Sequence, residues 1–72
     1  MYVYTLLTLK VNTKGGLVAV AESADQIQTL FGYMGLAGYP EPNLAEEFMV
    51  ADKFPVEETR PRILLYCPPT KL

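Results

Sequence analysis

The first residues of the chain, MYVYTLLTLKV, combine strand-forming residue types with apolar side chains at both odd and even positions. A strand with one face in water alternates apolar and polar residues, so this pattern predicts a strand over residues 2–11 that is apolar on both faces. The next five residues, 12–16 (NTKGG), are turn formers. Residues 16–22 (GLVAVAE) then predict the returning strand of a hairpin.

A helix is predicted directly after this hairpin. Ser23 and Gln26 have the spacing of a capping box, and Asp25 lies in the first turn, where the helix dipole favours a negative charge. Apolar residues then recur at spacings of three and four on one helix face: Ala24, Ile27, Leu30, Phe31 and Met34. The glycines and prolines of residues 35–43 (GLAGYPEPN) follow the helix, so they predict its end and a turn, not a phosphate-binding loop.

Residues 43–54 (NLAEEFMVADKF) fit two different patterns. Asn43 and Glu46 have a second capping-box spacing, and the residue types around them favour a helix of one or two turns. Residues 47–54 could equally form a third strand ahead of Pro55. Both interpretations stay open.

The C-terminal part predicts one more strand over residues 62–67 (RILLYC). Pro68 and Pro69 are expected to end it, because proline has no N–H to donate to a strand ladder. Residues 68–72 are then a short proline-containing tail.

These elements predict a single α+β domain over residues 1–72. Their order is β-β-α-(α or β)-β, and the expected fold is a mainly antiparallel sheet of three or four strands with one amphipathic helix packed on one face. Half of the residues are hydrophobic and 19% are charged, which is typical of a folded globular chain. A chain this short buries only about 60% of its unfolded surface, so association often adds stability.

One helix can cover only one face of the sheet, so the alternation of side chains along the strands decides which face stays exposed. By apolar content, the covered face is expected to hold Val3, Leu7, Leu9, Val11, Ile63 and Leu65. The opposite face is then expected to bind a partner through Tyr2, Tyr4, Leu6, Leu64 and Tyr66, with Lys10 and Arg62 at its border. The alternative is that the second helical segment or the proline-containing tail covers this face.

The net charge of -2 is concentrated in one segment. Residues 41–58 hold Lys53 together with the acids Glu41, Glu46, Glu47, Asp52, Glu57 and Glu58. No basic patch is present, so direct binding to nucleic acid is not expected. An acidic segment of this kind suits a basic protein surface, such as that of a nucleic-acid-binding protein, or is simply a solvated face.

The sequence offers little catalytic or ligand-binding chemistry. It has no His, and its one cysteine, Cys67, is expected to pack as a small hydrophobe. Ser23 is assigned to the helix cap, and adjacent Glu pairs do not converge on one point, so no enzyme, metal or cofactor is expected. No apolar run approaches the roughly 20 residues of a membrane span, and the uncharged start does not suit a signal peptide. A cytoplasmic protein is expected.

The expected function is that of a small acidic, non-enzymatic protein that docks on a larger partner through the Tyr-rich face and the acidic segment. In size and profile the chain resembles phage- and plasmid-encoded accessory proteins, which include inhibitors of host nucleic-acid-targeting systems, although no motif names a family. The alternatives are a homodimer that buries the same sheet face and a small-ligand-binding domain.

Overall fold

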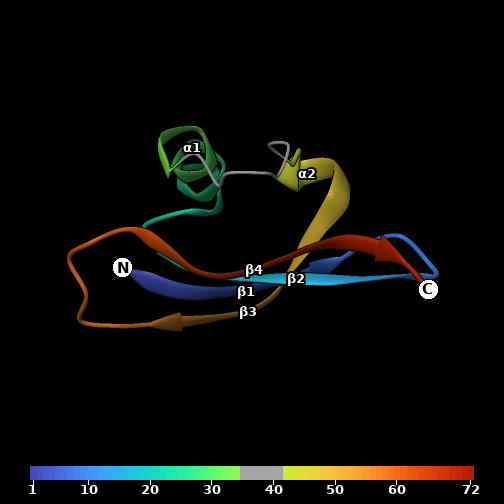
Figure 1. Cartoon of the computed structure of the whole chain (residues 1–72). Helices are drawn as coiled ribbons and strands as arrows, with labels where there is room; N and C mark the ends of the chain where they lie inside the picture. Colours follow the sequence, from blue (N-terminus) through green and yellow to red (C-terminus); the bar gives the residue numbers. More distant parts are fainter. Residues whose placement is uncertain (35–41) are drawn as a thin grey trace.

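The computed structural model describes residues 1–34 and 42–72, so most of the turn predicted over residues 35–43 lies outside the described residues. The four strands β1 (Tyr2–Thr8), β2 (Thr13–Ala21), β3 (Phe48–Pro55) and β4 (Arg62–Lys71) form one antiparallel sheet in the order β3-β1-β2-β4. Helix α1 (Ala24–Met34) and the single turn of α2 (Leu44–Glu47) lie on the same side of this sheet (Figure 1). The predicted α+β class with a mainly antiparallel sheet is confirmed.

The β1–β2 hairpin turns earlier than predicted. Strand β1 ends at Thr8, and the turn includes Asn12, which has a φ of 64° in the left-handed region that asparagine tolerates. The predicted turn residues 13–16 belong to β2 instead. Gly15 is needed there for close strand approach, because a Cβ at this position would lie 2.8 Å from the Cys67 carbonyl oxygen. Leu9 and Val11 are therefore exposed near the turn and do not lie on the covered face.

Both interpretations of residues 43–54 hold in part. The Asn43 side chain accepts a hydrogen bond from the Glu46 amide at 3.3 Å, and Glu47, not Glu46, reaches back to accept from the Asn43 amide at 2.8 Å. After this one helical turn the chain extends from Phe48 and pairs with β1. The cap starts a helix, but strand pairing and the burial of Phe48 end it.

Strand β4 continues through Pro68 and Pro69 to Lys71, so the prediction that the prolines end this strand was wrong. The physical reason is the place of β4 at the edge of the sheet, where one side of the strand needs no hydrogen-bond donors. A register shift between Lys14 and Gly16 places the two prolines opposite Gly15. The two prolines therefore remove few hydrogen bonds from the pairing of β4 with β2.

The helices cover the sheet face that was predicted to be exposed. Tyr4 and Leu6 are only 4% and 3% exposed. They belong to the core cluster with Leu17, Ala19, Ala21, Ile27, Phe31, Leu44 and Phe48, and Tyr2, Ile63 and Tyr66 pack against it. Strand β2 explains this choice, because its small Ala21 and Ala19 lie beside Tyr2 and Tyr4 in the ladder. The alanines leave space for α1, and the tyrosine rings fill the volume around them.

Candidate functional site

The sheet face opposite the helices is the strongest candidate for a functional surface; we call it the open face. Three rows of side chains cross all four strands on this face. In the order β3-β1-β2-β4 they are Phe54, Val3, Val20 and Arg62; Asp52, Thr5, Val18 and Leu65; and Met49, Leu7, Gly16 and Cys67. All are apolar except Arg62, Asp52 and Thr5. No described helix lies over this side of the sheet (Figure 1).

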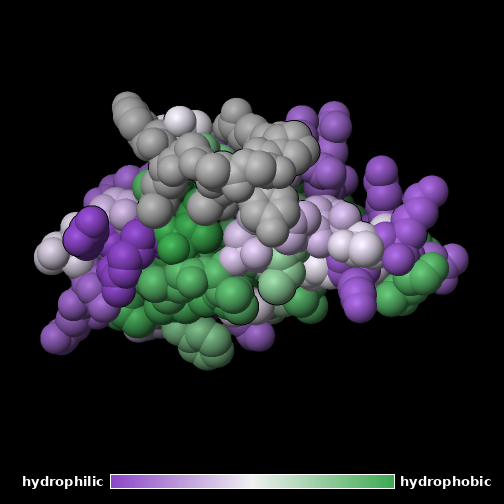
Figure 2. Space-filling model, in the orientation of Figure 1, coloured by the Kyte–Doolittle hydropathy of each residue, from purple (hydrophilic) through white to green (hydrophobic). Residues whose placement is uncertain are grey.

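The open face combines one closely packed side chain with large exposed ones. Val20, between Val3 and Arg62, is 1% exposed, although it lies outside the core cluster under the helices. Elsewhere on this face, Phe54 and Leu65 are 57% and 58% exposed, and Leu7 and Met49 are about half exposed. Figure 2 shows hydrophobic surface gathered in the sheet layer, with hydrophilic residues towards both ends of the molecule. Contiguous apolar surface of this kind marks interaction sites in soluble proteins.

Within its three rows, the open face carries one acid and one base, at opposite edges. Asp52 lies on β3, and Arg62 lies on β4 in the neighbouring row. Arg62 forms a partly exposed ion pair with Glu58 at 3.3 Å and donates a hydrogen bond to the Arg60 carbonyl oxygen at 3.0 Å. The charged groups of the three rows therefore lie at the margins of the open face, and Thr5 is the one polar side chain between them.

Both sheet edges carry features that hinder the addition of another strand. In β3 a register shift between Thr5 and Leu6 leaves Ala51 without a partner, and the Lys53 ammonium lies 4.1 Å from the centre of the Tyr2 ring. In β4 one register shift lies at Pro68 and Pro69, and a second lies at Leu64. Bulges, prolines and inward-pointing charges are the usual protection of edge strands. Association through the open face is thus favoured over pairing at the edges.

The residues predicted to bind a partner are divided by the fold. Tyr4 and Leu6 are buried under α1 and Tyr66 packs on Phe31, so the prediction that these side chains form an exposed face was wrong. Tyr2 is partly buried and lies under Lys53. Leu64 is half exposed, at the point where the pairing of β4 with β2 shifts register.

The acidic segment does not form one surface. Glu46 and Glu47 lie on α2, whereas Glu57 and Glu58 lie in the connection between β3 and β4, towards the opposite end of the sheet (Figure 1). Asp52 is on the open face, between these two groups in the sequence. Glu47 and Glu58 also have local partners, the Asn43 amide and Arg62. Glu41 lies outside the described residues.

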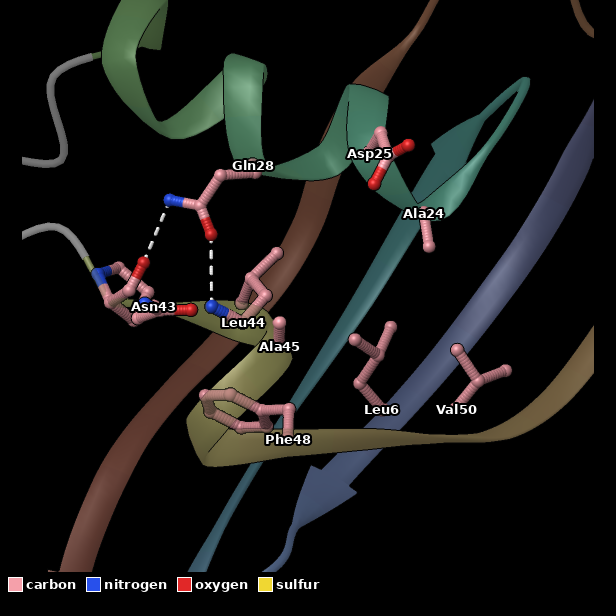
Figure 3. Close-up of a pocket in the computed structure, with 10 residues that line it drawn as sticks. Leu6, Ala24, Asp25, Gln28, Asn43, Leu44, Ala45, Phe48 and Val50 are labelled. Atoms are coloured by element: carbon pink, nitrogen blue, oxygen red, sulfur yellow. Dashed lines mark hydrogen bonds between the residues drawn. The ribbon is translucent and has the colours of Figure 1, made fainter.

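A groove of about 540 Å³ lies on the covered side of the sheet. Its lining includes Leu6, Phe48 and Val50 from the sheet, and Asp25 is the one charged residue among the described residues that line it. The Gln28 side chain joins α1 to α2 there: it donates to the Pro42 carbonyl oxygen at 2.8 Å and accepts from the Leu44 amide at 2.9 Å (Figure 3). Because Gln28 holds α2 in place, its amide serves the fold first, and the groove is the weaker candidate.

Other chemistry is sparse in the described part of the chain. Over residues 1–34 and 42–72, no three His, Cys, Asp or Glu side chains gather closely enough to hold a metal ion. The Cys67 thiol is exposed, so the prediction that it packs inside was wrong. Neither described helix is long and apolar enough to cross a membrane.

Sequence reasoning missed the apolar side chains of the open face, of which Val18 is partly buried and four are exposed: Phe54, Met49, Leu7 and Leu65. A signal for them was present in residues 17–21, where Leu17, Ala19 and Ala21 alternate with Val18 and Val20. The small alanines mark the face that a helix can approach closely, and the two valines mark the other.

Comparisons of the chain with protein-family models, with curated proteins and with solved structures found no match.

Proposed function

We propose that this protein is a small non-enzymatic interaction module that acts by burying its open face against another protein surface. The carrying observation is the set of half-exposed apolar side chains on this face, which no described segment covers. Large, exposed apolar side chains such as Phe54, Met49 and Leu65 are of the kind found in interface cores. Their distribution over β1, β3 and β4 supports docking of a surface that spans several strands.

Two acidic residues remain part of this proposal as a rim: Glu57 and Glu58, which follow β3 at the end of the open face. Glu46 and Glu47 lie on α2, on the covered side of the sheet, and do not border the open face. Rim charges change association rates more than affinity. They would suit a larger partner with basic residues around an apolar patch, such as a nucleic-acid-binding protein. An exposed free thiol is compatible with a reducing compartment such as the cytoplasm.

Photo-crosslinking tests the proposal without a known partner. Benzoylphenylalanine placed at position 65, on the open face, is expected to give protein adducts when the full chain is illuminated in a lysate of its source cells. The matched control carries the same group at Thr29, which is exposed on α1, on the other side of the sheet. Adducts to any protein, including the chain itself, from position 65 alone support the proposal. Equal adducts from both positions, or none, would contradict it.

A further inference from the structure

We infer that the occupant of the open face is a second copy of this chain, packed face to face about a two-fold axis. The functional unit is then a sandwich of two sheets with the helices on its outer sides. This inference rests on the proposed function, since it names the partner of the same face. Three features of the open face carry it: the placement of its charges, the state of the sheet edges, and its extent.

The charges of the open face complement themselves. A two-fold axis parallel to the strands lays β3 of one copy over β4 of the other. Asp52 and Arg62 lie on these two strands, one row apart, which is about 7 Å along the strand direction. The Asp52 carboxylate of each copy then approaches the Arg62 guanidinium of the other, and the contact occurs twice. Arg62 can keep Glu58 as well, because a guanidinium has several N–H donors.

Because both sheet edges hinder strand pairing, two copies are expected to associate through the open face. Lys53, Pro68 and Pro69, and the register shifts hinder a sheet that would continue from one copy to the next. Two sheets packed face to face, about 10 Å apart, avoid this obstacle because they use side chains alone. Val20, which is buried outside the helix-side core, then lies in a second core shared by the two copies.

The extent of the face suits a reversible dimer. Strand spacing and rise give four strands and three rows a footprint of about 20 by 20 Å. With the relief of protruding side chains, about 600 Å² would be buried per copy, near the lower limit for specific interfaces. A dimer with a dissociation constant in the micromolar range is expected. A small chain buries little of its surface when it folds alone, so burying the open face in a dimer adds stability.

Sedimentation equilibrium of the full chain from 1 µM to 1 mM, a range chosen to bracket the expected constant, tests the inference. The wild type is expected to change from monomer to dimer. Leu65→Asp should raise the dissociation constant at least about 30-fold, because it places a charge in the buried interface. Val11→Asp is the matched control: Val11 is 86% exposed and lies outside the three rows, so its dimer should be unchanged. Circular dichroism checks the fold of each variant.

Reversing the charges of Asp52 and Arg62 tests whether the partner is a second copy and whether the two-fold axis runs parallel to the strands. Asp52→Arg and Arg62→Glu should each weaken dimerisation alone, because each places like charges opposite one another. An equimolar mixture of the two variants should dimerise again, since both cross-contacts become attractive. These exposed or partly exposed polar positions also keep the test valid if Leu65→Asp does not fold.

A wild type that is monomeric at 1 mM overturns the inference, as does a dimer that survives Leu65→Asp or is not restored in the mixture. The proposed function is judged separately by the crosslinks. Adducts to a different protein from position 65 would keep the proposed function and remove the second copy as the partner. The absence of any adduct would remove both.

Discussion

The ring of Tyr66 on β4 packs edge-to-face against the ring of Phe31 on α1, with 4.9 Å between the ring centres. This contact joins an edge strand to the helix and lies on the side of the sheet that the helices cover. Aromatic pairs in this geometry stabilise beyond their buried area alone. The tyrosine expected to touch a partner is therefore a support of the fold, and the surface available to a partner is the opposite one.

Phe31→Ala should lower the free energy of unfolding by about 3 to 5 kcal/mol, because it removes a 5% exposed ring and leaves a cavity beside Tyr66. Urea unfolding followed by circular dichroism measures the change. Phe31→Leu, which keeps part of the volume, should lose less. Val11→Ala, at an exposed position, is the control and should stay within about 0.5 kcal/mol of the wild type. Equal stability of the Phe31→Ala and Val11→Ala variants would contradict the core assignment.

Gln28→Ala should release α2 from α1. The substitution removes the hydrogen bonds to the Pro42 carbonyl oxygen and the Leu44 amide, at a cost of about 1 to 3 kcal/mol. Hydrogen exchange at the Leu44 amide is expected to become faster than in the wild type. Thr29→Ala is the matched control, because the Thr29 hydroxyl bonds only weakly to the Asp25 carbonyl oxygen within the same helix, at 3.4 Å. If Leu44 exchanges at the wild-type rate in Gln28→Ala, Gln28 does not hold α2.

Lys53→Ile should expose the β3 edge to strand addition. The Lys53 ammonium lies over the Tyr2 and Tyr4 rings, and its loss also removes a cation–π contact of about 0.5 to 1 kcal/mol. Light scattering over time should show larger, irreversible assemblies in this variant. Lys10→Ile, an exposed substitution in the connection between β1 and β2, is the control for added hydrophobicity alone. The same aggregation in both variants would show that Lys53 has no special role at the edge.

Alkylation of Cys67 should report the occupancy of the open face. The thiol is exposed and lies in the row with Met49, Leu7 and Gly16, so a second copy would shield it. The rate constant for iodoacetamide at fixed pH is expected to fall as protein concentration rises through the micromolar range. A Cys67→Ser, Thr59→Cys variant moves the thiol to the exposed connection between β3 and β4, where the rate should not depend on concentration. A concentration-independent rate at Cys67 as well would contradict shielding of the open face.

Local sequence signals predicted much of the architecture. The Ser23 hydroxyl accepts from the Gln26 amide at 3.3 Å, as the capping-box spacing indicated, and α1 begins at Ala24. The Gln26 side chain accepts from Glu22 at 2.7 Å, one residue earlier than the capping box implies. Such caps could be predicted because their partners lie within a few residues of each other in the chain.

The sequence by itself determined that the protein is an α+β domain with a mainly antiparallel sheet, and it predicted one open sheet face, with the second helical segment or the tail as the alternative cover. One amphipathic helix has a single apolar stripe and therefore covers only one of two apolar sheet faces. Only the tertiary structure decided which face is open, because the choice depends on how β2 and β4 pair with their neighbours. The small Ala19 and Ala21 beside the tyrosines let α1 approach, and bulges in β3 and β4 change which side chains share a face. Pairing between strands distant in sequence, more than local pattern, sets such a register.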